Sequence, residues 1–171
     1  MAGDTDWMSL GEWVVALRDL HHQARLGKLS PEELNRYHEE RETLARAILS
    51  AQRLRAAPGA KGRKFLRVAR ELKVDLIIDG AQVETRTLDF GVGGVAVMLD
   101  RPVHVPQQFD LRLELERGSS VSTRVRVVSV QRKGKPYRVA FGFENLSAED
   151  TERIGLAVFD AALAGIMPVE N

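Results

Sequence analysis

Two arginines four residues apart, in the stretch RKFLRV, are the strongest candidates for ligand chemistry in this sequence. Arg63 and Arg67 follow a segment rich in Gly, Ala and Pro and come just before a strand-like run. A guanidinium group can fork onto a phosphate, stack on a flat base, or read the N7 and O6 acceptors of guanine. The pair therefore predicts an anionic or aromatic ligand, with a solvated basic linker as the alternative.

A glycine-rich stretch, LDFGVGGVAV at residues 88–97, is the second candidate. Asp89-Phe90-Gly91 matches the metal-binding triplet of kinases, but a kinase needs a separate catalytic loop and a much longer chain. The glycines do not have the dinucleotide-binding spacing, and a strand-like run follows them instead of a helix. Glycines between two strands permit a bulge, a positive φ, or the close approach of another backbone or a ligand.

The sequence does not have the patterns expected of an enzyme or a metal site. His21 and His22 are adjacent, so a helix would splay them apart, and the other two histidines are His38 and His104. The chain contains no cysteine, which removes disulfides, thiolate metal sites and a cysteine nucleophile. The serines lie in predicted caps and turns. We therefore expect no enzyme, no catalytic residue, no metal site and no cofactor.

The composition favours a folded globular chain with no membrane span. The 171 residues are 44% hydrophobic and 29% charged, and no long apolar run occurs. The acidic N-terminus has no basic segment of a secretory signal, so we expect a cytoplasmic protein. A net charge of +1 argues against nucleic acid as a partner, although residues 53–73 hold eight basic residues and one acidic residue.

Residues 7–57 are predicted to form two amphipathic helices, because apolar residues recur there at steps of three and four. Gly27 is placed to end the first helix, and Ser30, Pro31 and Glu33 form the pattern of a capped start for the second. Two such helices cannot bury both apolar stripes alone. We expect this helical hairpin to pack on the rest of the chain or on a second copy, as a homodimer.

After residues 55–62, which we interpret as a hinge, the apolar period switches to two. Six strand-like segments follow, with Asp79-Gly80 as a hairpin turn, and a last helix begins near Ser147. The sequence thus predicts an α+β chain. Its domains are a helical extension at residues 1–57 and a six-stranded antiparallel β-barrel with a C-terminal helix at residues 58–171.

The order of these motifs resembles the PilZ domain family. The Arg-x-x-x-Arg segment comes first, a strand hairpin follows, and then Asp89, Gly91 and Gly94 form Asp-x-Gly-x-x-Gly. The resemblance covers residues 61–165, including YRVAFGFENLSAED before the last helix. It implies a PilZ-type β-barrel with a C-terminal helix.

The resemblance also implies binding of cyclic di-GMP, a bacterial second messenger, without chemistry on it. The ligand-binding residues of the family fall on Arg63, Arg67, Asp89, Gly91 and Gly94. Guanidinium groups can pair with phosphates and stack on a purine, and a carboxylate can accept hydrogen bonds from the guanine edge. The family has serine where this chain has Gly91, and a missing neutral hydrogen bond costs roughly 0.5–1.5 kcal/mol.

Two functions therefore remain open. One is a cyclic di-GMP receptor in which the ligand moves the Arg63–Arg67 segment and reorients the helices across the hinge, coupling the messenger to motility or envelope processes. The other is a degenerate domain that binds no nucleotide and acts as an adaptor, either for a protein of a motility or envelope pathway or for a second copy of itself. A nucleic-acid binder using residues 53–73 is a weaker third reading, because Phe65 is the one aromatic residue in that run.

Overall fold

The computed structural model describes residues 9–55, 64–132 and 134–166. It divides into two compact units, one of Met1–Ala57 with Ala162–Asn171 and one of Pro58–Ala161. The first boundary follows Ala57, and residues 162–171 cluster with the first unit. Apart from Arg55, the predicted hinge at 55–62 lies outside the described residues, and so does Arg63.

The first unit contains helices α1 (Leu10–Arg25) and α2 (Pro31–Arg55), which confirms the two predicted N-terminal helices. A serine and a glutamate begin each helix as a reciprocal pair. In α2, Ser30 Oγ accepts a hydrogen bond from the Glu33 N–H, and the Glu33 carboxylate accepts one from the Ser30 N–H. These bonds satisfy backbone donors that a helix start otherwise leaves unpaired. Gly27, at φ 65°, follows the end of α1.

The two helices contact each other through a buried polar and aromatic pair. Leu17 and Tyr37 are completely buried, and the Tyr37 hydroxyl lies 2.7 Å from Nδ1 of His21. The guanidinium of Arg41 lies 5.3 Å from the centre of the Tyr37 ring. The apolar pattern of the sequence predicted that Tyr37 lies on the contact face of its helix. The hydrogen bond between Tyr37 and His21 was not predicted.

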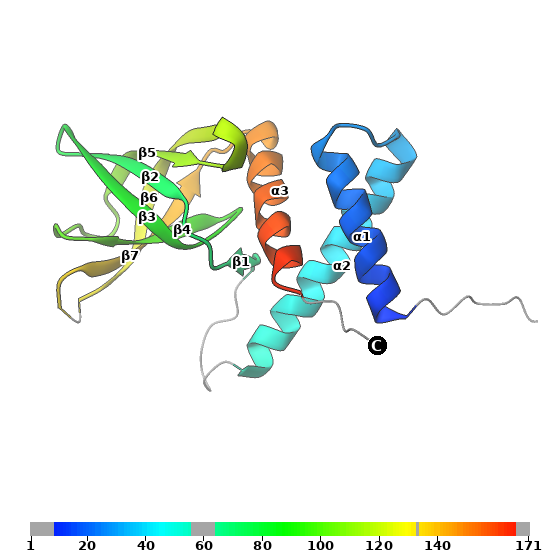
Figure 1. The fold of residues 1–171 in the computed structure, drawn as a ribbon. Coiled ribbons are helices and arrows are strands. Elements are labelled where there is room, and N and C mark those ends of the chain that lie inside the picture. The colour runs from blue at the N-terminus through cyan, green and yellow to red at the C-terminus, as the bar shows by residue number, and fades with distance from the viewer. Residues whose placement is uncertain (1–8, 56–63, 133, 167–171) are drawn as a thin grey trace, which may run out of the picture. The chain divides into compact units, whose positions relative to one another are not determined.

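The second unit is an antiparallel barrel followed by helix α3 as far as Ala161 (Figure 1). Its strands pair in the order β1-β3-β2-β5-β6-β7-β4, and an additional β3–β4 pairing closes the barrel. The elements are β1 (Arg67–Val68), β2 (Lys73–Ile78), β3 (Ala81–Gly91), β4 (Gly94–Leu99), β5 (Gln108–Glu114), β6 (Ser120–Gln131), β7 (Tyr137–Glu144), the 3-10 turn η1 (Glu116–Gly118) and α3 (Ala148–Ala164).

The six long strands, β2 to β7, are those that the alternating pattern predicted, and the barrel with its helix is confirmed. Val74, Leu76 and Ile78 of β2 point inward and are almost fully buried, as the period of two requires. From α3, Ile154 and Val158 are buried as well. The short strand β1 is an addition, because two residues are too few to show a period.

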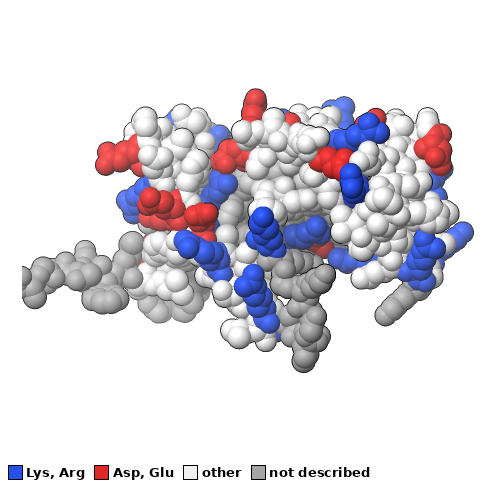
Figure 2. Space-filling view, turned by 180° about the vertical axis from the view of Figure 1, so that it is seen from behind, with Lys and Arg blue, Asp and Glu red and all other residues white. Residues whose placement is uncertain are grey.

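Charged side chains of both signs are interspersed over the face shown in Figure 2. This distribution agrees with a formal net charge of +1. Within the part of the chain that the structure describes, no helix is long and apolar enough to span a membrane.

Candidate functional site

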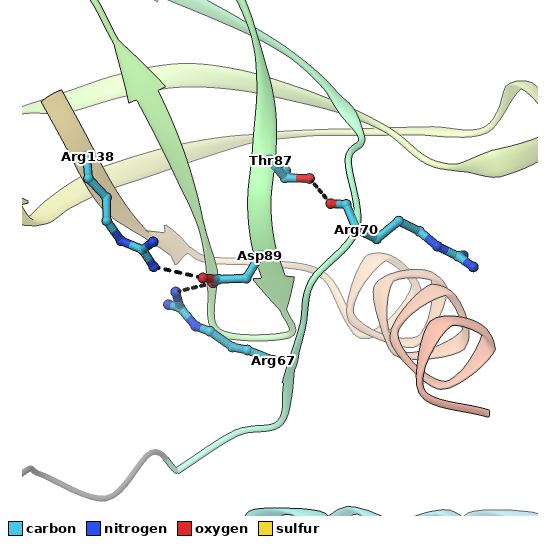
Figure 3. Close-up of polar contacts among 5 residues, drawn as sticks. All are labelled: Arg67, Arg70, Thr87, Asp89 and Arg138. Atoms are coloured by element: carbon cyan, nitrogen blue, oxygen red, sulfur yellow. Dashed lines mark hydrogen bonds and ion pairs between the residues drawn. The ribbon is translucent and has the colours of Figure 1, made fainter. Parts of the chain in front are cut away.

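A carboxylate held between two guanidinium groups lies where β1 meets the barrel (Figure 3). Nη1 of Arg67 on β1 donates to Oδ1 of Asp89 on β3, at 3.0 Å. Nη2 of Arg138 on β7 donates to Oδ2 of the same residue, at 2.9 Å. The side chain of Asp89 is 14% exposed, and those of Arg67 and Arg138 are 22% and 37% exposed. We call these three residues the Asp89 cluster.

A β-bulge and a short strand place these side chains together. In the β3–β4 pairing, Thr87 is opposite Val97 but Asp89 is opposite Ala96, so Leu88 is an extra residue on β3. A bulge bends the strand and changes where the following side chains point. Beyond the bulge, β1 adds to β3 with Arg67 opposite Gly91.

Both motif glycines are required by close approaches inside the chain. A Cβ on Gly91 would lie 2.3 Å from the carbonyl oxygen of Leu66, just before β1. A Cβ on Gly94 would lie 1.9 Å from the carbonyl oxygen of Phe141 on β7. Neither position has room for a side chain while these backbones stay where they are. The absence of a side chain at Gly91 therefore allows β1, and with it Arg67, to close against β3.

The segment between β1 and β2 is fixed to the barrel by a buried hydroxyl. Thr87 is 1% exposed, and its hydroxyl donates to the carbonyl of Arg70 (Figure 3). The same hydroxyl accepts a hydrogen bond from the Leu72 N–H at 2.8 Å. The Arg70 guanidinium lies 3.1 Å from Glu116 and 3.3 Å from Asp160 on α3. These contacts limit the freedom of the chain that carries Arg67.

The structure brings four of the five predicted site residues together. Arg67 and Asp89 bond directly, Gly91 lies opposite Arg67, and Gly94 pairs with Gly91 across the β3–β4 turn. Arg63 lies outside the described residues.

Arg138 is a member of the site that sequence reasoning missed. Its register partner on β4 is Met98, and β4 also pairs with β3, so the strand order β3-β4-β7 brings Arg138 next to Asp89. The sequence contained one signal for it, since the charged Arg138 stands between the alternating residues Tyr137 and Val139, and Val139 is buried. That signal shows that Arg138 faces outward, but not which strand it faces.

The chemistry of the Asp89 cluster suits anion binding. Two positive groups and one negative group leave a local charge of +1, from 2 − 1. A guanidinium has five N–H donors, so both arginines keep donors beyond the bonds to Asp89. Among the described residues, no group of three or more His, Asp or Glu side chains is arranged to hold a metal ion.

Solved structures with the same fold include bacterial proteins. The motility inhibitor MotI (DgrA) of Bacillus subtilis matches with a TM-score of 0.56 and 16% identity, over 63% of this chain and 55% of that chain. This chain therefore spans little more than half the length of MotI. The PilZ domain of Escherichia coli YcgR, solved with c-di-GMP, matches with a TM-score of 0.50 and 15% identity, over 60% and 92% of the two chains.

The complex of MrkH from K. pneumonia with c-di-GMP matches with a TM-score of 0.53 and 17% identity, over 61% of this chain and 54% of that one. At these identities the likeness concerns the fold. No match was found among curated proteins. The sequence model of the PilZ domain family, however, matches residues 61–160. This range is more than half of the chain and contains the whole Asp89 cluster. The chain therefore belongs to the PilZ domain family.

Proposed function

We propose that this protein is a receptor for cyclic di-GMP and not an enzyme. The observation that carries the proposal is the Asp89 cluster, in which Arg67 and Asp89 stand at the positions of the family motifs and bond to each other. Arg63, which opens the first motif, is proposed as a further ligand residue.

The ligand's chemistry matches that of the cluster. Cyclic di-GMP carries two phosphate charges and two guanine bases. The arginines would pair with phosphate oxygens or stack on a base, and Asp89 would hold them in place or accept hydrogen bonds from a guanine edge. Gly91 and Gly94 would contribute through the shape of the β3–β4 turn.

The comparisons support this choice of ligand. The PilZ domain of YcgR was solved with c-di-GMP, and MrkH was solved as a c-di-GMP complex. MotI is described as an inhibitor of motility, which supports coupling to motility as one output. We propose that residues 1–57 and 58–171 act as two domains of a cytoplasmic protein, and that ligand binding rearranges them across residues 55–62 to act on a motility or envelope component.

A second candidate function is favoured by Gly91. The family's serine is absent, and β1 occupies the space that a side chain at this position would need. A domain that has lost its ligand would act as an adaptor, with the helices α1 and α2 binding a partner protein or a second copy.

Isothermal titration calorimetry of cyclic di-GMP into the full chain tests the proposal. We expect saturable binding that weakens by about tenfold to a hundredfold in Arg67→Ala, because hydrogen bonds to charged groups are worth roughly 1.5–3 kcal/mol. Arg112→Ala removes an exposed arginine of β5 and is the matched control, with unchanged affinity expected. No heat at ligand concentrations of about 100 μM would exclude binding stronger than roughly −5.5 kcal/mol and would favour the adaptor.

A further inference from the structure

Phe65 is an exposed aromatic residue in the middle of the RKFLRV segment, and the proposed site does not yet include it. The residue is 47% exposed, although burial of a Phe side chain is normally favourable. It lies two residues before Arg67, so it is next to a member of the Asp89 cluster in the sequence.

The ring of Phe65 rests on the glycine-rich turn between β3 and β4. A Cβ built on Gly93 would lie 3.0 Å from Cδ2 and 3.6 Å from Cε2 of the ring, so the ring occupies the space where a side chain would be. The turn itself is fixed, because the carbonyl of Gly93 accepts a hydrogen bond from the Phe143 N–H on β7 at 3.0 Å. The ring therefore rests on backbone held by a hydrogen bond, while the residue remains exposed to solvent.

Positive charge lies close to this ring. The ammonium nitrogen of Lys64 is 5.4 Å from the ring centre, and Arg67 follows Phe65 by two residues in the sequence. An aromatic face beside cations that can bind phosphates is the arrangement with which proteins bind single nucleotides and single strands.

We propose that Phe65 stacks on a base of the bound nucleotide. The inference rests on the proposed function, since it assigns a further contact to the same ligand. The cations bind the phosphates, Phe65 covers one face of a purine, and Gly93 is glycine because the ring lies on it. Stacking depends on a flat π-surface and not on hydrogen-bond donors, so this contact adds affinity with little preference between purines.

Calorimetry of cyclic di-GMP with four full-length variants tests the proposal. Phe65→Ala and Phe65→Leu are expected to weaken binding by about tenfold or more, whereas Phe65→Trp keeps it within about threefold, because only the last retains an aromatic face. Ile77→Ala is the matched control. Ile77 is 44% exposed on β2, so a comparable apolar side chain is removed elsewhere, and no change is expected.

Fluorescence gives a second, direct readout. The natural tryptophans, Trp7 and Trp13, lie in the N-terminal segment, so a tryptophan at position 65 reports on the site. Quenching by cyclic di-GMP in Phe65→Trp, beyond that of the wild type, is expected. Binding by Phe65→Ala as tight as that of the wild type, or equally tight binding by Phe65→Leu, overturns the stacking role alone. Failure of the wild type to bind overturns the proposed function, and the role of Phe65 with it.

Discussion

The Arg67 guanidinium and the Asp89 carboxylate lie 3.0 Å apart, although 22 positions separate them in the sequence. Their contact depends on β1, which adds to the end of β3 beyond the bulge at Leu88. The same carboxylate receives a second bond from Arg138 on β7. Three strands that are separate in the sequence are thus connected through one side chain.

Because the Asp89 cluster is partly buried, its ion pairs are expected to stabilise the barrel more than exposed pairs do. A double-mutant cycle of Arg67→Ala and Asp89→Ala, followed by urea unfolding, is expected to give a coupling free energy of about 1–2 kcal/mol. The same cycle on Lys73 and Glu84, a more exposed pair at 3.3 Å, is expected to give less than about 0.5 kcal/mol. Equal coupling in the two cycles would contradict the structural importance of the cluster.

Gly94 and Gly142 are register partners on β4 and β7, but only one of them tolerates a side chain. At Gly94 a Cβ would collide with the Phe141 carbonyl, whereas at Gly142 it would lie 3.3 Å from a methyl group of Val128. Since Val128 is 60% exposed, that methyl group can move aside. We expect Gly94→Ala to lower the free energy of unfolding by about 3 kcal/mol or more and Gly142→Ala by less than about 1 kcal/mol. Urea denaturation of both variants decides the matter, and similar losses would refute the explanation.

Gly91 is expected to control whether β1 stays paired. A Cβ at this position cannot coexist with the Leu66 carbonyl at 2.3 Å, so both Gly91→Ala and Gly91→Ser must displace β1. We expect faster hydrogen exchange at Arg67 and Val68 in both variants and a destabilisation of about 1–3 kcal/mol. The alanine variant separates the effect of the Cβ from that of the serine hydroxyl. Unchanged exchange in Gly91→Ala would show that β1 accommodates the side chain without leaving β3.

The sequence was sufficient to predict the helices and the six long strands, since each carries a clear period and clear end signals. Ser30 with Glu33 predicted the start of α2, and Asp79-Gly80 predicted the β2–β3 turn, where both residues have positive φ. The alternation in β2 predicted its buried face. In each case the information is local, so neighbouring residues are enough to reveal it.

The geometry of the site was less accessible, because it depends on pairing between distant strands. The motif order predicted that Arg67 and Asp89 belong together, but not that they bond directly. Arg138 joins them through the order of three strands, which no local pattern reveals. The need for glycine at Gly94 comes from the carbonyl of Phe141. Phe141 is distant in the sequence, and only the pairing of β4 with β7 brings it close.

Thr87 is expected to be the main anchor of the segment that leads from Arg67 to β2. Thr87→Val keeps the shape but leaves the Leu72 N–H and the Arg70 carbonyl without their hydroxyl partner, at a cost of about 1–3 kcal/mol. Thr85→Val is the control, since the Thr85 hydroxyl donates a hydrogen bond to the Met98 carbonyl at 2.8 Å, and a loss of about 1 kcal/mol is expected. Thermal unfolding of the two variants compares them, and a smaller loss for Thr87→Val would be inconsistent with its anchoring role.

The capping box of α2 is expected to make helix stability depend on acid pH. The hydrogen bond from the Ser30 backbone lowers the pKa of Glu33 from its ordinary 4.5. A carboxyl whose pKa is lower in the folded state adds stability above 4.5, and that stability is lost as the pH falls through the lowered value. The thermal midpoint of the helical circular-dichroism signal should therefore be lower in Glu33→Gln than in the wild type at neutral pH, and the difference should shrink at pH values well below 4.5. Glu32→Gln removes the same charge from the same turn but outside the capping box, and it should lower the thermal midpoint by less. A lowering of the midpoint in Glu33→Gln that does not change with pH would refute the role of the ionised carboxylate.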